Sequence, residues 1–435
     1  MRLPPLFLVL ASVLASIGRA EDIQSDLSAE IKSTGSAGLA ETYNRTIHLG
    51  ESTSIKLAYP NSRFIYIRFS KLDLPPGDIL TLSTNETTVV YKGHGRRRHR
   101  PMTTIHDDTS FYSDRLMGDA VEVTYTPDKA NKDKKHQSSK NYRSFGISIG
   151  SYIRGVARVS STDGTSLVNP ACVSAAPAWR PASCFKESDP QVYKSSRSLA
   201  RMVMLGSSSS VAQYATGFLV GCSGYFLTNE HNVRTQTQVD ATDFGFLAAS
   251  PTCDDVCNRR SLGCPPKLLL RGSATLVAVD TSLDYALLRF DSHARRQLKR
   301  LNVAYLPLRK DKANWTRLTG ERIYVPQHPD GTAAKVAARL KSGHDAVIVD
   351  ANVANKCGKR QLGYMADTIG GSSGSPVVAS TDHTVLGLHH CGECNAGADG
   401  MALRTAICIH DILVDLKKKQ VKLPSCFTGD IGQDD

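Results

Sequence analysis

Beyond residue 20 the sequence lacks any long apolar run. The apolar stretch over residues 6–17 is short for a helix that crosses a bilayer, and no comparable uncharged stretch follows it. Arg2 before this stretch and the small residues at Gly18 to Ala20 after it are typical of a secretory signal peptide. We therefore expect residues 1–20 to be a signal peptide, no membrane span, and secretion to the extracellular space.

Cysteine is absent from the first part of the chain: all eleven cysteines lie between Cys172 and Cys426. In a secreted protein they indicate a disulfide framework, and the odd number leaves at least one thiol unpaired or bonded to a partner. The spacing of Cys253, Cys257 and Cys264 is irregular for zinc, and the expected compartment is oxidising. We therefore predict no metal site.

Acidic side chains are outnumbered by basic ones, which gives a formal charge of +12. Much of the excess lies in two patches, Arg96–Arg100 and Lys129–Lys140, which lack the interleaved aromatic side chains on which single-stranded nucleic acid would stack. Both patches lie between strand-like segments, so we interpret them as solvated loops and expect no nucleic-acid partner. Proteolytic processing and polyanion binding are the alternatives.

Three N-glycosylation sequons agree with secretion. They begin at Asn44, Asn85 and Asn314.

Residues 21–42 are polar and alanine-rich, and we expect a linker or pro-segment there. From residue 43 to about residue 159 the chain alternates apolar and polar residues in short runs bounded by Gly, Pro, Asn and Ser, which predicts an antiparallel β-sandwich. The runs are Thr46–Leu49, Ser54–Leu57, Phe64–Phe69, Ile79–Leu82, Val121–Tyr125 and Phe145–Ile149.

The residues over 64–82 and 118–125 make this first domain resemble the CUB-like jelly rolls that accompany secreted enzymes. The resemblance implies a jelly-roll-like sandwich and transfers no site. Because the domain has no cysteine and no cluster of catalytic residue types, we expect it to bind a glycan or protein ligand, or to act as a propeptide that keeps an enzyme latent.

After a connector at 160–188 that contains Cys172 and Cys184, residues 189–426 again form many short strand-like segments, and residues 427–435 are an acidic tail. Only Ile409–Lys419 has convincing helical periodicity, with lysines late in the segment. Many short strands closed by one helix predict an all-β fold of two packed β-barrels. The strand-like segments are Leu199–Leu205, Thr216–Val220, Tyr225–His231, Leu268–Val279, Tyr285–Phe290, Arg322–Val325, Ala346–Val349 and Val385–Leu388.

The most informative motif is Gly-Gly-Ser-Ser-Gly-Ser-Pro at residues 370–376. Ser373 alone fits Gly-x-Ser-Gly, a tight turn in which backbone N–H groups converge on one point and can hold an oxyanion. A serine nucleophile needs a base and a carboxylate that orients it. His231 ends a strand-like segment and Asp284 begins another, with Asp280 as the rival carboxylate.

The chain order His231, Asp284, Ser373 is that of the double-barrel serine proteases. Together with the Thr-Gly-Phe-Leu-Val segment at 216–220, these three motifs resemble the trypsin-like superfamily. The resemblance implies a chymotrypsin-like double barrel, an acyl-enzyme mechanism with this triad, an oxyanion hole made by Gly371 and Ser373, protein or peptide substrates, and no cofactor.

Within that superfamily, the form of the serine loop and the segment Gln-His-Pro-Asp-Gly at 327–331, followed by Lys335, resemble the microbial lysyl and glutamyl endopeptidases. The chain departs from them where a cysteine usually follows the histidine, because Asn232 stands there and Ala215 replaces its usual partner. Both halves are missing together, which indicates a lost disulfide in a working fold.

The same resemblance implies several cysteine pairs. Cys172 is expected to reach the region of Cys391 and Cys394, and Cys184 to pair near Cys253. The further pairs suggested are Cys257 with Cys264, Cys357 with the remaining one of Cys391 and Cys394, and Cys408 with Cys426, which leaves Cys222 as the odd thiol.

The substrate pocket contains residues of contradictory character. By the resemblance, Asp367 and Asp399 fit recognition of a basic residue before the cut, whereas Thr368 and His389 fit recognition of glutamate. Because an unpaired carboxylate would repel glutamate, we expect cleavage after Lys or Arg, with glutamyl specificity as the alternative. His389 or His390 could equally be a packed core histidine.

Two other classes compete with a protease. One is an inactive homologue that binds through its first domain. Replacement of a triad residue would indicate such a homologue, but no triad residue is replaced. A cationic adhesion protein rests only on the basic patches, and deletion of residues 96–100 would then abolish retention on heparin.

Overall fold

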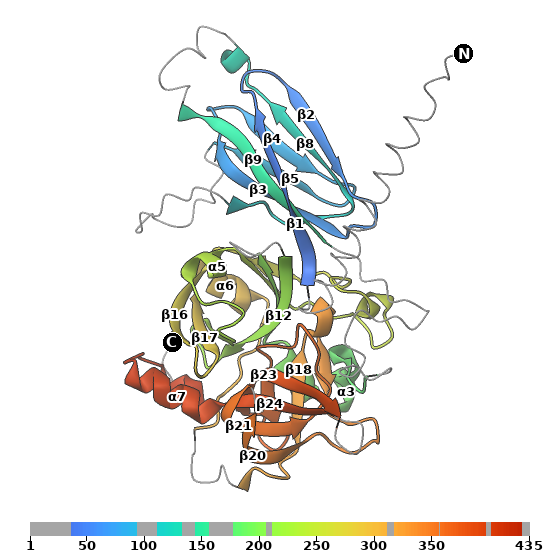
Figure 1. Cartoon of the computed structure of the whole chain (residues 1–435), viewed down its shortest axis with the longest axis vertical. Coiled ribbons are helices and arrows are strands. Elements are labelled where there is room, and N and C mark those ends of the chain that lie inside the picture. Colours follow the sequence, from blue (N-terminus) through green and yellow to red (C-terminus); the bar gives the residue numbers. More distant parts are fainter. Residues whose placement is uncertain are drawn as a thin grey trace, which may run out of the picture.

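The computed structural model describes residues 36–93, 111–132, 144–155, 177–205, 211–310, 317–355, 357–396 and 402–428 (Figure 1). Several predicted features lie outside these ranges or, for the side chain of Cys394, outside the described side chains: the signal peptide, Arg96–Arg100, Cys172, Asn314 and Asp399.

The first domain is a two-sheet β-sandwich, drawn in blue and cyan in Figure 1. One layer has the strand order β1-β9-β3-β6, with β7 also paired to β3, and the other has the order β2-β8-β4-β5. In β8 buried and less buried residues alternate, as period-two patterning requires. The strands are β1 (Ser36–Ile47), β2 (Thr53–Ala58), β3 (Phe64–Asp73), β4 (Ile79–Ser83), β5 (Thr88–Lys92), β6 (Phe111–Tyr112), β7 (Leu116–Met117), β8 (Ala120–Thr126) and β9 (Gly146–Gly155).

The start of this domain differs from the sequence-based expectation. β1 begins at Ser36, inside the segment predicted as a linker, and it ends at Ile47, so the predicted run Thr46–Leu49 contains the last two residues of the strand and the start of the turn that follows. Polar residues form a strand here because their backbone groups pair with β9 on one side and, over Ser36–Leu39, with β12 on the other.

The second region contains a first β-barrel built on the order β15-β14-β11-β12, with β13, β17 and β16 continuing from β12. An aromatic cluster fills its core, in which Phe226 contacts Phe244, Phe246 and Phe290 edge to face. The strands are β11 (Leu199–Leu205), β12 (Val211–Val220), β13 (Tyr225–Thr228), β14 (Thr242–Phe246), β15 (Leu268–Leu270), β16 (Ala274–Asp280) and β17 (Tyr285–Phe290).

A second barrel follows, with the order β10-β19-β18-β22-β23-β24-β21-β20. Backbone hydrogen bonds from Ile323 to Ala346 and from Ile348 to Glu321 join the start of β18 to the start of β20, the last strand in this order. The two barrels confirm the predicted all-β, chymotrypsin-like fold. The strands are β10 (Arg180–Pro181), β18 (Ile323–Gln327), β19 (Lys335–Ala337), β20 (Val347–Asn355), β21 (Gly358–Met365), β22 (Pro376–Ala379), β23 (Val385–Ala396) and β24 (Ala402–Cys408).

The C-terminal helix α7 (Ile409–Lys418) is close to its predicted span, and it buries Ile412 and Leu416 in the core that joins the two barrels. The sequence patterns missed the other helices. α6 is capped by Asp291 and buries only Ala294 and Leu298, too short an apolar stripe to stand out. These helices are α3 (Phe185–Ser188), α4 (Pro190–Ser196), α5 (Gln236–Asp240) and α6 (Ser292–Arg300).

The described helices contain none with the length and apolar character needed to cross a membrane.

The sandwich and the first barrel share one twelve-stranded sheet, because β1 pairs with β9 of the sandwich and with β12 of the barrel (Figure 1). We call the contact between these two parts the seam. Its apolar core combines residues of both: Phe64, Tyr66, Ile153, Val203, Leu205, Ala212, Tyr214 and Leu262.

A buried polar cluster lies in the seam. The Tyr66 hydroxyl of the sandwich donates to Asp243 Oδ2 at 2.5 Å, and Arg271 Nε donates to Asp243 Oδ1 at 2.6 Å. Arg271 also donates to the carbonyl oxygens of Tyr112 and Ser113, which belong to the sandwich. One barrel ion pair therefore holds three groups of the sandwich.

Four disulfides lie in the described part of the chain, and they test the implied pairing. Cys184–Cys253, Cys257–Cys264 and Cys357–Cys391 agree with it, and the first two exclude a metal site at those cysteines. The pairing of Cys408 with Cys426 is wrong, because Cys426 bonds Cys222.

Cys408, not Cys222, is therefore a free thiol. Burial raises its pKa to about 12, so the thiolate is disfavoured and the group is inert. Cys222 lies in the turn after β12, and the chain around Cys426 packs against that turn through Phe427, a proximity that the linear sequence does not reveal.

The predicted glycosylation residues Asn44 and Asn85 are both exposed, the first at an irregularity in β1 and the second in the turn between β4 and β5.

Candidate active site

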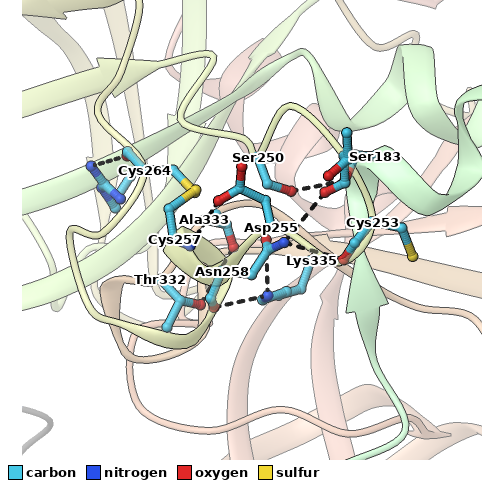
Figure 2. Close-up of a disulfide and its surroundings, with 12 residues drawn as sticks. Ser183, Ser250, Cys253, Asp255, Cys257, Asn258, Cys264, Thr332, Ala333 and Lys335 are labelled. Atoms are coloured by element: carbon cyan, nitrogen blue, oxygen red, sulfur yellow. Dashed lines mark hydrogen bonds between the residues drawn. A yellow bond between two sulfur atoms is a disulfide. The ribbon is translucent and has the colours of Figure 1, made fainter.

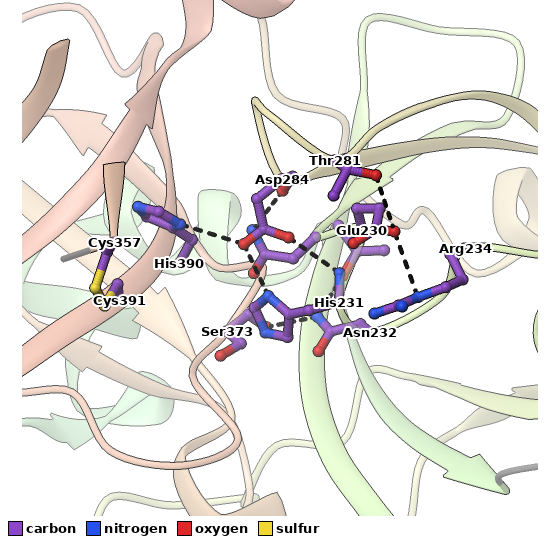
Figure 3. Close-up of polar contacts among 12 residues, drawn as sticks. Glu230, His231, Asn232, Arg234, Thr281, Asp284, Cys357, Ser373, His390 and Cys391 are labelled. Atoms are coloured by element: carbon purple, nitrogen blue, oxygen red, sulfur yellow. Dashed lines mark hydrogen bonds and ion pairs between the residues drawn. A yellow bond between two sulfur atoms is a disulfide. The ribbon is translucent and has the colours of Figure 1, made fainter. Parts of the chain in front are cut away.

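Two paired strands bring His231 and Asp284 together. β13 ends at Thr228, three residues before His231, β17 begins just after Asp284, and the two strands are antiparallel partners. The His231 backbone N–H donates to Asp284 Oδ1 at 3.0 Å, and His231 Nδ1 lies 2.8 Å from Asp284 Oδ2 (Figure 3). The carboxylate thus fixes the histidine through both its backbone and its ring.

Asp284 has a left-handed backbone conformation with φ of 41°, which non-glycine residues seldom adopt. Its carbonyl accepts a hydrogen bond from Asn229 Nδ2 at 3.0 Å, so this conformation is held from both sides of the residue. Burial alone would raise the pKa of Asp284, but hydrogen bonds from His231 and His390 outweigh it and hold the pKa well below its usual range. The carboxylate is therefore ionised at neutral pH.

The rival carboxylate, Asp280, points elsewhere. It pairs with Lys419 of the C-terminal segment at 2.8 Å and accepts the backbone N–H of Leu283. Its role is structural.

The serine loop lies beside the His231 ring (Figure 3). Gly371 adopts φ of +93°, and a Cβ there would lie 2.7 Å from Asp330 N and 2.8 Å from His328 O. Only glycine fits this position. The Thr216 hydroxyl donates to Gly371 O at 2.8 Å, and its backbone N–H donates to Ser373 O at 2.9 Å, so β12 supports the loop directly.

The amide N–H groups of Gly371 and Ser373 donate to no acceptor in the described part of the chain. The carbonyl of Gly370 is occupied by Asp330 N–H at 2.7 Å, which fixes the peptide plane before Gly371. Two unused donors two residues apart, with one residue between them, are what an oxyanion site requires.

Of the three serines in the loop, only Ser373 is not buried. The Ser372 hydroxyl donates to Gln327 Oε1 at 2.5 Å. Within the described residues, no hydrogen bond joins the Ser373 hydroxyl to His231. Such bonds are often long without substrate and tighten when it binds.

Asn232, which stands where the resemblance would place a cysteine, makes two hydrogen bonds. Its side-chain N–H groups donate to Thr228 Oγ1 at 3.0 Å and to Ser373 O at 3.4 Å. Asn232 therefore ties the histidine segment to the serine loop, a contact different from the disulfide to position 215 that the resemblance would place here.

Lys335, part of the motif that resembles the lysyl and glutamyl endopeptidases, lies away from this site. Its Nζ donates to the backbone and side-chain oxygens of Asn258, at 3.0 and 3.2 Å, and holds the disulfide loop of Cys257 and Cys264 (Figure 2). Burial lowers the pKa of Lys335 to about 8.

Three of the four predicted pocket residues lie in the described part of the chain. Asp367 Oδ2 accepts the Ala178 N–H at 2.5 Å, so one of its oxygens is already used. Thr368 and His389 are buried, and His389 Nδ1 lies 2.7 Å from the Tyr364 hydroxyl. Burial first, and the neighbouring positive charge of Arg404 second, lower the pKa of His389 to about 3, so this ring is neutral.

Arg404, which the sequence analysis missed, joins this group of side chains. It lies on β24 opposite Gly392 of β23, and a Cβ on Gly392 would lie 2.5 Å from the Arg404 guanidinium. Its charge attracts that of Asp367. In the sequence, Gly392 could have indicated a long side chain on the neighbouring strand, but nothing identified that side chain as Arg404.

His390 is a second histidine on Asp284. Its Nδ1 lies 3.2 Å from Asp284 Oδ2, the same oxygen that the His231 ring contacts (Figure 3). Only 5% of its side chain is exposed. The sequence allowed for a packed core histidine here but not for this contact.

Comparison with known proteins identifies the superfamily of this chain. The trypsin-like peptidase domain matches residues 215–388. Secreted RxLR effector protein 73 of Plasmopara viticola is 31% identical over 334 residues, which are 76% of this chain and 75% of that protein.

Among solved structures, an HtrA-type protease, AlgW with a tripeptide, has a TM-score of 0.36 and 14% identity over 53% of this chain and 62% of its own length. The active form of the Rv3671c protease from M. tuberculosis has a TM-score of 0.36 and 17% identity over 60% of this chain and 96% of that one. From the domain match and the relative, the chain belongs to the trypsin-like serine protease superfamily, in the family that includes the Plasmopara viticola effector.

Proposed function

We propose that this protein is a secreted serine endopeptidase whose catalytic residues are His231, Asp284 and Ser373. The observation that carries the proposal is that an ionised Asp284 holds His231 by two hydrogen bonds beside a serine loop with two amide donors that no described residue uses. Eight cysteines in disulfides support an oxidising, extracellular location.

The geometry assigns each group a step. Because Asp284 occupies Nδ1 of the His231 ring, Nε2 is the nitrogen left to take the proton of Ser373 as the hydroxyl attacks a peptide carbonyl. The N–H groups of Gly371 and Ser373 bind the oxyanion of the tetrahedral intermediate. The imidazolium then gives its proton to the leaving amine, and water, activated by the same ring, hydrolyses the acyl-enzyme.

The test is labelling of the secreted protein with a fluorophosphonate probe, followed by peptide mapping. We expect label on Ser373 only, and none in Ser373→Ala. Ser375→Ala is the matched control, because this buried hydroxyl has no hydrogen-bond partner in the described residues, and it should label like the parent. A folded parent that takes no label would overturn the proposal.

The name of the relative favours a second candidate. A protein named as a secreted effector can act by binding, and this chain would then be an inactive homologue that uses its sandwich to bind a glycan or protein ligand. Absence of labelling in a folded parent would support this candidate.

The residue before the cut is a separate proposal. The expected basic preference rests on Asp367, whose carboxylate accepts a backbone N–H and lies near the opposite charge of Arg404. Because His389 is neutral, Arg404 is the cation of this group, and it favours the glutamyl alternative. We therefore propose an acidic residue before the cut.

We expect a peptide library to be cleaved after Glu or Asp, and Arg404→Ser to lower kcat/KM for those peptides by roughly 10–100-fold, the range of one charged hydrogen bond. Asp367→Asn is the control and should retain the acidic preference. Cleavage after Lys or Arg that is lost in Asp367→Asn would instead support the basic preference.

A further inference from the structure

We propose that a cavity next to the segment that supports the serine loop binds a small phenolic carboxylate: a carboxylate at one end, an apolar body and a hydroxyl at the other end. No residue of the triad is among the residues that line this cavity. The binding of such a ligand is independent of the proposed function. Only the effect of the ligand on the serine loop rests on that function.

The cavity has a volume of about 260 Å³ and lies where three segments meet. Helices α3 and α4 supply one part of its lining, the residues that follow β14 supply another, and the chain between β18 and β19 supplies a third. Pockets for drug-sized ligands typically measure about 300–1,000 Å³. The occupant of this cavity must therefore be a small molecule.

Every charged side chain in the lining is cationic. Lys186 and Lys267 are exposed and Arg197 is half-buried, so these groups lie toward solvent. Within the described residues none of the three forms an ion pair, and Arg197 donates to the carbonyl oxygens of Leu301 and Asn302, at 3.1 and 3.0 Å. Three cations without a counter-charge favour an anionic group at this end of the cavity.

The walls of the cavity are largely apolar. The Ser196 hydroxyl in the lining donates to the carbonyl oxygen of Tyr193 at 2.6 Å, and the Ser250 hydroxyl lies 2.8 Å from that of Ser183, so both are already used (Figure 2). Burial of apolar surface then favours an occupant with an apolar body. The buried apolar residues of the lining are Leu199, Leu247, Ala248 and Ala334.

His328 gives the buried side of the lining a hydrogen-bond acceptor. It is 1% exposed, and its Nδ1 lies 2.9 Å from the carbonyl oxygen of Thr332, so Nδ1 carries the ring proton. Burial lowers the pKa of His328 to about 3, so Nε2 keeps its lone pair, and Nε2 has no partner among the described residues. A buried acceptor without a donor is costly, and a hydroxyl on the occupant would satisfy it.

The same histidine connects the cavity to the serine loop. Its backbone N–H donates to Thr216 Oγ1 at 3.0 Å, and that hydroxyl donates to Gly371 O at 2.8 Å. Two residues further along, the Asp330 N–H donates to Gly370 O at 2.7 Å. An occupant that holds His328 should therefore stabilise the present conformation of the serine loop and raise the rate at which its serine reacts.

The first test is calorimetric titration of the full-length secreted protein with 4-hydroxybenzoate, and it needs no activity. We expect saturable binding at a single site. Benzoate lacks the hydroxyl and 4-hydroxybenzyl alcohol lacks the carboxylate, so each should bind at least about tenfold more weakly. Absence of saturable binding at millimolar concentration would overturn the proposal. Equal binding of benzoate, or of acetate, would overturn it in favour of an unspecific site.

Two exposed lysines locate the ligand. The double variant Lys186→Gln with Lys267→Gln removes two of the three cations and should weaken binding about tenfold. Lys194→Gln is the matched control, because Lys194 is an exposed lysine of α4 outside the lining, and it should bind like the parent. Equal binding by the double variant and the parent would place the ligand elsewhere and contradict the proposal.

The effect on the serine loop has a readout of its own. Saturating 4-hydroxybenzoate should raise the rate at which a fluorophosphonate probe labels Ser373 about fivefold or more. At the same ligand concentration the double variant should respond less. An unchanged rate in a parent that binds the ligand would overturn the connection to the loop, and a parent that takes no label would count against the proposed function alone.

Discussion

Ser373→Ala is expected to lower kcat about a million-fold on a peptide that the parent cleaves, which is the size of loss seen when a triad serine is removed. The reason is that no other hydroxyl can replace it: Ser372 is buried and donates to Gln327, and Ser375 is buried. The residual rate should still exceed that in water, because the amide donors of Gly371 and Ser373 remain in the variant. Single-turnover and steady-state kinetics measure the loss.

Ser375→Ala serves as the matched variant in the same loop and should stay within about tenfold of the parent, since it removes no hydrogen bond to any described residue. Equal activity of Ser373→Ala and the parent would mean that cleavage comes from elsewhere, or from a contaminant, and the assignment of the triad would fail.

Asp243→Ala is expected to lower the free energy of unfolding by about 3–5 kcal/mol. Its carboxylate is 2% exposed and Arg271 is 11% exposed, so removal of Asp243 leaves a buried guanidinium without its counter-charge. The Tyr66 hydroxyl loses its acceptor at the same time. Urea unfolding of the full-length protein measures the change.

The double variant Asp243→Leu with Arg271→Met separates the ion pair from the shape of the seam. Because it removes both charges together, it should be more stable than Asp243→Ala even though it changes more atoms. A loss below about 1 kcal/mol in the single variant would show that the seam contributes little to stability.

The contacts in the seam also indicate whether the sandwich is a propeptide. A propeptide that is released must separate from the enzyme, yet here separation would break the β1–β12 pairing and expose Tyr66 and Asp243. We therefore propose that the sandwich remains part of the mature protein, in which residues 189–426 are the protease domain. In that protein the sandwich would bind a glycan or a protein.

The fold could be predicted where its signals are local. Strands such as β4 and β8 alternate in burial, and Ile409–Lys418 has a helical stripe. The prediction of a linker at residues 36–42 failed, because Ser36–Leu39 is a strand only by virtue of partners far along the chain. The disulfide between Cys222 and Cys426 was not predicted for the same reason, since 204 residues separate the two cysteines.

The residues of the candidate site were likewise predictable only where their signals are local. His231, Asp284 and the serine loop are each recognisable from a few neighbouring residues, and the structure places them together. Arg404 and His390 gain their importance from contacts across strands, and nothing beside them in the sequence marks those contacts. Asn232 could be recognised as a departure from a motif, but not as a hydrogen-bonding substitute.

The strand β1 imposes an order on folding. Its first residues, Ser36 to Leu39, are made early, but their partners in the first barrel, Val211 to Gln213, are synthesised much later. Contacts of such high sequence separation form slowly, and amino-terminal domains fold first during synthesis. The sandwich should therefore fold first and present the start of β1 as an unpaired strand edge, with which β12 pairs later. During that interval the edge is exposed to pairing with other chains, so the yield of native protein should depend on how quickly the first barrel follows.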